Sequence, residues 1–103
     1  MDFERRSNME LNKNQYVMYK GLPLVREGDT ICYGDLSEKY MLMLNILTKK
    51  ENGEPDTIMV QICYTDDKHK IVKGKQAFKN GLYEALDLGI IWLEQLIKDD
   101  SQQ

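Results

Sequence analysis

The residues best suited to chemistry lie where one predicted strand ends. Cys63 could act as a nucleophile, and His69 could act as a general base or a metal ligand. Asp66 and Asp67 lie beside the histidine, but ligands confined to one turn make a poor metal site, and Asp-rich turns are common for conformational reasons alone. Because Cys63 and Cys32 fall on predicted strands, away from a helix N-terminus that would lower their pKa, we expect neither thiol to be catalytic.

Motifs that combine residue type with spacing are missing from the chain. It contains no GxGxxG, P-loop, HExxH or GxSxG pattern and no paired cysteines. The plentiful carboxylates of the C-terminal segment, Glu84, Asp87 and Glu94, follow what we expect to be the solvent side of a helix. The sequence therefore predicts a protein that is not an enzyme and has no cofactor and no metal.

A run of lysines with no acid among them is the clearest electrostatic feature. It consists of Lys68, Lys70, Lys73, Lys75 and Lys79. The first four could contact phosphate or an acidic partner, and a nucleic-acid-associated regulator is the alternative function that they suggest. The simpler interpretation is an edge strand that its lysines protect against pairing with other sheets. The net charge of −3 argues against a general nucleic-acid binder.

Length and composition indicate one globular domain. The chain has 103 residues, of which 42% are hydrophobic and 30% charged. No run approaches the roughly 18 apolar residues of a membrane span, so we expect a cytoplasmic protein with reduced cysteines. Residues 1–14 read as a flexible N-terminal arm, residues 15–98 as a single α+β domain, and residues 99–103 as a C-terminal tail.

Alternating apolar residues predict an antiparallel meander. A short run at 16–19 precedes a hairpin, in which residues 24–26 and 30–33 flank a turn at Glu27, Gly28 and Asp29. Pro23 cannot donate to a ladder, so its strand should be an edge strand or begin there. Two longer strands, 40–48 and 57–65, form a second hairpin, and residues 68–75 offer at most a short strand around Ile71 and Val72.

From residue 78 onward the period changes to that of an amphipathic helix. Its apolar stripe comprises Phe78, Leu82, Ala85, Leu86, Gly89, Trp92, Leu93, Leu96 and Ile97. Asn80 is the expected N-cap, and the alternative is a start near Gln76. A glycine at position 89, inside the stripe, suggests close approach of helix and sheet. The predicted fold is an antiparallel β-meander of about four to five strands packed against one C-terminal amphipathic helix, an α+β two-layer sandwich.

The two long strands are unusual because neither face is polar. One face should pack against the helix, with Tyr40, Leu42, Leu44, Ile46, Ile58, Val60, Ile62 and Tyr64. The other face should offer an interaction surface made of Met41, Met43, Leu47, Met59, Gln61 and Cys63. An apolar face of this kind is usually covered, by a second copy, by another protein or by residues 1–14.

Two segments carry a resemblance to known proteins. They read KGLPLVREGDTICY at 20–33 and GLYEALDLGIIWLEQLI at 81–97. Together they resemble small bacterial proteins of unassigned function that share a short sheet and a C-terminal helix, a likeness that brings no known site with it. In element order alone the chain is also similar to β-sheet-plus-helix antitoxins. We therefore predict a small cytoplasmic interaction module that pairs with itself as a homodimer or with another protein.

Overall fold

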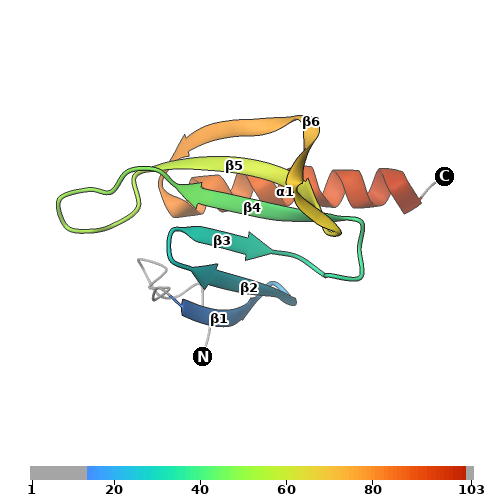
Figure 1. The fold of residues 1–103 in the computed structure, drawn as a ribbon, viewed down its shortest axis with the longest axis horizontal. Coiled ribbons are helices and arrows are strands. Elements are labelled where there is room, and N and C mark those ends of the chain that lie inside the picture. Colours follow the sequence, from blue (N-terminus) through green and yellow to red (C-terminus); the bar gives the residue numbers. More distant parts are fainter. Residues whose placement is uncertain (1–13, 102–103) are drawn as a thin grey trace.

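Six antiparallel strands in chain order and one helix make up the fold, seen in a computed structural model that describes residues 14–101. Each strand pairs with the next, so the sheet has the order β1-β2-β3-β4-β5-β6 (Figure 1). The elements are β1 (Asn14–Tyr19), β2 (Leu22–Glu27), β3 (Thr30–Tyr33), β4 (Tyr40–Ile46), β5 (Thr57–Tyr64), β6 (Asp67–Asn80) and α1 (Leu82–Ser101). The predicted α+β class is confirmed, with six strands instead of four to five.

Tight turns set the register of the first three strands. Lys20 and Gly21 join β1 to β2 with φ angles of 50° and 84°, the pattern of a type I′ turn that matches the strand twist. Gly28, with φ of 64°, begins the predicted turn between β2 and β3. Pro23 lies in β2, which is an internal strand and begins at Leu22, one residue before the proline, so of the two predicted placements the start of a strand is the one observed. Pro23 lies opposite Gly34, which follows the last residue of β3, and the Gly34 N–H donates to the Pro23 carbonyl oxygen at 3.2 Å. The N–H that Pro23 lacks would fall at the end of the β2–β3 pairing, so its absence does not interrupt the ladder.

The predicted hairpin of the two long strands is confirmed, but the segment that follows differs from the prediction. Residues 67–80 form one 14-residue strand, and its pairing with β5 shifts register between Gln61 and Cys63. Phe78 belongs to this strand and is exposed on the side away from the helix, so its place in the helical stripe is wrong. The helix begins at Leu82, and Ala85 N–H donates to the Gly81 carbonyl oxygen at 3.2 Å. Gly81 is thus the N-cap residue, and neither Asn80 nor Gln76 starts the helix.

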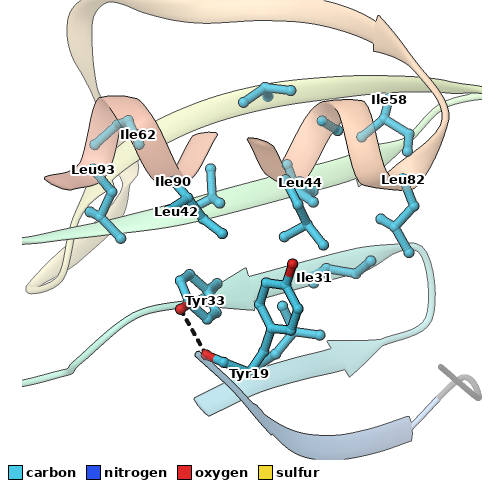
Figure 2. Close-up of a cluster of buried hydrophobic side chains, with 14 of the residues drawn as sticks. Tyr19, Ile31, Tyr33, Leu42, Leu44, Ile58, Ile62, Leu82, Ile90 and Leu93 are labelled. Carbon is cyan, nitrogen blue, oxygen red and sulfur yellow. Dashed lines mark hydrogen bonds between the residues drawn. The ribbon is translucent and has the colours of Figure 1, made fainter. Parts of the chain in front are cut away.

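The hydrophobic core lies between α1 and one face of the sheet. The helix packs across β4, β5 and β6, behind the sheet in the view of Figure 1. Figure 2 shows Leu42, Leu44 and Ile62 meeting helical side chains, with Tyr19 and Tyr33 extending the core over β1 and β3. The predicted sheet residues are buried here except Tyr40 and Tyr64, which are half-buried and pair with each other, their ring centroids 5.5 Å apart.

Gly89 brings the helix against the sheet as predicted. A Cβ atom at this position would overlap both terminal methyl groups of Leu42 and would lie 3.0 Å from its Cγ. The Leu42 side chain is fully buried, so it has little room to move. Ile90, which was not among the predicted stripe residues, is also buried in this interface. No helix of the described residues is long and apolar enough to cross a membrane.

Candidate functional site

The register of the sheet gathers the predicted interaction residues on the face away from α1, which we call the open face. One row across β1 to β6 contains Tyr16, Val25, Cys32, Met43, Gln61 and Gln76. Neighbouring rows add Met41 with Cys63 and Asn45 with Met59. Leu47 lies one residue beyond β4, where its N–H donates to the Thr57 carbonyl oxygen, and its side chain is exposed.

Part of the open face is covered by the chain itself. Met41, Gln61 and Cys63 are buried, whereas Met43 and Met59 are half-buried. In Figure 1 the first half of β6 lies in front of β4, and its Ile71 pairs with Cys63 across the shifted register. Gln61 and Cys63 are therefore not available for direct contact with a partner, whereas Met41, although only 3% exposed, lines a cavity on this face.

Polar residues in the middle of the open face satisfy one another. The Thr30 hydroxyl donates to Asn45 Oδ1 at 3.2 Å, and Asn45 Nδ2 donates to Gln61 Oε1 at 3.1 Å. At the β6 edge, Gln76 Nε2 donates to the sulfur of Met59 at 3.0 Å. The first two bonds link β3, β4 and β5, and the third links β5 to β6. Among the described residues, no buried side-chain nitrogen or oxygen lacks a hydrogen-bond partner.

A cavity of about 430 Å³ lies on the open face over the β1 to β3 half of the sheet. Its wall is mainly apolar, and Met41 contributes to it from β4 while Leu36 contributes from the loop after β3. The charged side chains are Glu27 and Lys68. The full lining is Tyr16, Pro23, Val25, Glu27, Thr30, Cys32, Tyr33, Gly34, Leu36, Met41 and Lys68.

The lining residues of β2 extend along the strand from Pro23 to Glu27. Glu27 and Thr30 face each other in the β2 and β3 register at one end of this stretch. Pro23 lies four residues away along β2, about 13 Å at 3.3 Å per residue, at its other end. Lys68, which reaches the cavity wall from the start of β6, is the only lysine or arginine of that wall.

The structure distributes the lysines of the basic segment over different surroundings. Lys68 lines the cavity, whereas the Lys70 ammonium lies 5.2 Å from the centre of the Tyr64 ring. Lys75 lies 5.4 Å from the centre of the Trp92 ring, on the helix side of the sheet. Lys73 is exposed. Because β6 is an edge strand, these positions fit the simpler interpretation of lysines that guard an edge.

The two thiols and the histidine lie in different surroundings. Burial raises the pKa of the buried Cys63 thiol, and the nearby Cys32 raises it further. Burial also raises the pKa of the Cys32 thiol in the cavity wall, against an opposing effect of Lys68. His69 is exposed and does not line the cavity. The backbone N–H of His69 donates to Asp67 Oδ1 at 3.1 Å, which is the conformational role expected for an Asp-rich turn. Residues 14–101 contain no group of side chains suited to a metal ion.

Sequence reasoning anticipated two of the lining residues, Met41 and Lys68, and assigned them to rival functions. It missed Tyr16, Val25 and Leu36, which lie on β1, β2 and the loop after β3. The alternation of Tyr16 with Met18 was a usable signal, because it places both on the open face as soon as β1 pairs with β2. The exposed Leu36 follows no periodic pattern, so only the folded chain shows that it borders the cavity.

No family model matches this chain. No curated protein and no solved structure matches it either. The resemblance to small bacterial proteins of unassigned function stays a prediction. The function of the chain is therefore inferred from the geometry of the open face.

Proposed function

We propose that the protein is a binding module without a catalytic role, and that its cavity holds an apolar group of a protein partner. The observation that carries this proposal is the cavity itself. Its volume of about 430 Å³ lies in the range of roughly 300 to 1,000 Å³ that is typical of ligand sites. The wall is mainly apolar, and Glu27, Thr30 and Lys68 are among its few polar or charged side chains, an arrangement that suits an anchoring side chain with polar neighbours.

The proposal moves the predicted interaction surface along the sheet. Met41 stays within it as part of the cavity wall, and Met43 stays beside Cys32 in the register. Gln61 and Cys63 become internal support, because both are buried under the chain's own residues. Tyr16 and Leu36 join as exposed apolar contacts at the wall, where a partner would remove them from water.

A fluorescent apolar probe tests whether the cavity accepts a guest. We expect anilinonaphthalene sulfonate to bind the folded protein with a stoichiometry of one, because its rings match the wall and its sulfonate suits Lys68. Cys32→Trp should fill the cavity and abolish the fluorescence increase. Phe78→Trp introduces the same side chain at an exposed position of the open face outside the cavity, and should bind the probe as wild type does. A folded wild type that leaves the probe dark, or unchanged binding by Cys32→Trp, would contradict the proposal.

Nucleic-acid binding has less support from the geometry. A phosphate backbone needs several cations on one accessible surface, whereas Lys75 lies against Trp92 on the helix side and Lys68 lines the open-face cavity. Filter binding of RNA and DNA at low salt separates the two functions. We expect no retention, and retention that falls steeply with added salt would favour the alternative.

A further inference from the structure

The two edges of the sheet differ in how they are protected. β6 exposes Lys68, Lys70 and Lys73, and Gly74 interrupts it with a φ of 79°. β1 reads NQYVMY and carries neither a charge nor a proline. Charges, prolines and irregular backbone are the usual means by which an edge avoids pairing with another strand. The β1 edge has none of them.

β1 directs outward the backbone groups of its alternate residues Asn14, Tyr16 and Met18. Tyr19 and Leu22 flank a two-residue turn, so they form a hydrogen-bonded pair. Hydrogen-bonded and non-hydrogen-bonded pairs alternate along an antiparallel ladder, which places Val17 in the next bonded pair with Leu24. The N–H and C=O groups of Tyr16 and Met18 therefore point away from β2, toward a side on which no strand of residues 14–101 pairs.

The side chains of the same two residues are the exposed apolar groups of β1. Tyr16 is 62% exposed and Met18 is 52% exposed. Both lie on the open face, where the Tyr16 hydroxyl donates to the sulfur of Met18 at 3.4 Å. Backbone groups that pair with no strand of residues 14–101 and exposed apolar side chains thus coincide at two alternate positions.

We propose that β1 pairs antiparallel with β1 of a second copy of the chain, about a two-fold axis at Val17. This axis sets Tyr16 of each copy opposite Met18 of the other, and each such pair exchanges both of its backbone hydrogen bonds. It also brings an aromatic ring beside a thioether on the open face, a favourable contact. The two sheets join into one.

A second copy fits this edge better than a peptide of unrelated sequence. The outward groups of β1 are complementary to themselves under a two-fold rotation, and the strand carries no charge that would be repelled by its own copy. Tyr16 lines the cavity, so Met18 of the second copy would extend the cavity wall across the interface. The pairing itself rests on the edge alone and does not depend on what the cavity binds.

Sedimentation of the full chain over a dilution series tests the pairing. Wild type should approach twice its mass of 12.1 kDa at high concentration. The double variant Tyr16→Lys with Met18→Lys puts lysine opposite lysine at both pairs and should remain a monomer. Both positions are exposed, so the variant should fold, and circular dichroism checks this. Phe78→Lys, which adds a charge at an exposed aromatic position of the opposite edge, is the matched control and should dimerise as wild type does.

A charge swap tests the register. Tyr16→Lys with Met18→Glu places opposite charges across the interface only if the axis lies at Val17, so this variant should recover the dimer that the double lysine variant loses. Val17→Cys in a Cys32→Ser background should also form a disulfide between copies, because a non-hydrogen-bonded pair lies within disulfide reach.

Three results would overturn the proposal. A wild type that stays monomeric at high concentration would show that the edge is closed by residues 1–13 or left unpaired. A dimer that the double lysine variant does not weaken would place the interface elsewhere. A charge-swapped variant that remains monomeric like the double lysine variant would exclude the axis at Val17.

Discussion

Both faces of the sheet carry apolar side chains that alternate along β4 and β5, but the two faces are covered in different ways. Leu42 and Met41 are neighbours on β4, and both are buried. Leu42 packs against a separate element, the helix α1, whereas Met41 lines the cavity of the open face, to which the start of β6 contributes Lys68. An apolar strand face is therefore not by itself an interface, because a long edge strand can bend over it.

The largest expected effect is a difference in the free energy of unfolding between substitutions at two adjacent residues, one on each face of the sheet. Leu42→Ala should lower the free energy of unfolding by about 2 to 5 kcal/mol, because it leaves a void in a fully packed core. Met43→Ala should cost only about 1 kcal/mol, because this side chain is half-buried beside the cavity. Urea denaturation of both variants measures the difference. Equal losses would mean that the open face is packed as tightly as the helix face.

A smaller effect tests the closest contact between helix and sheet. Gly89→Ala should destabilise the protein by about 1 kcal/mol, since overlap with Leu42 outweighs the gain in helix propensity. The double variant Gly89→Ala with Leu42→Ala should lose less than the sum of the single losses, because the new methyl group enters the space that the leucine vacates. Strict additivity in denaturant unfolding would show that the two residues do not touch.

An effect of similar size concerns a polar group at the margin of the helix face. The Tyr33 hydroxyl donates to the Tyr19 carbonyl oxygen at 2.8 Å (Figure 2), and Tyr33→Phe should cost about 1 kcal/mol at neutral pH. Burial, with a contribution from Glu94, raises the pKa of Tyr33. The folded protein therefore holds the Tyr33 hydroxyl proton more tightly than the unfolded chain does. The contribution of Tyr33 to the free energy of unfolding falls as the pH rises above about 10.

The alkaline part of this prediction has its own readout. The wild type should lose stability between about pH 9 and 11, partly through Tyr33 and partly through the half-buried Cys32 and the buried Cys63, whose pKa values are also raised. Tyr33→Phe should flatten this decline and leave the part due to Cys32 and Cys63. Parallel stability curves for wild type and variant above pH 9 would contradict a raised pKa for Tyr33.

The sequence predicted the elements that have a strong local period. The long hairpin alternates over seven or more residues, and the helical stripe from Leu82 onward repeats over four turns, so both were recognisable. β6 was underestimated because its lysines and Gly74 interrupt any period, and it is held as a strand by pairing with β5. Phe78 was misassigned because its spacing to Leu82 fits a helix as well as a strand, and only the backbone at Gly81, with φ of 94°, separates the two.

The candidate site was predictable only in part. Alternation shows which residues share a face, and for Met41, Met43 and Met59 that is correct. It does not show that β6 shifts its register and bends, which buries Cys63 and brings Lys68 beside Cys32. The cavity depends on this bend and on a loop residue, Leu36, and so on contacts between segments far apart in the chain.

The order of elements has a consequence for how the chain is made. Every strand pairs with the one synthesised just before it, so the meander can assemble hairpin by hairpin as it emerges. The helix that covers the apolar face of β4, β5 and β6 comes last, and its 20 residues take about one to four seconds to translate at roughly 5 to 20 residues per second. Until α1 has been added, the apolar face of these strands lacks the helix that buries it, and exposed surface of this kind makes a folding intermediate prone to aggregation.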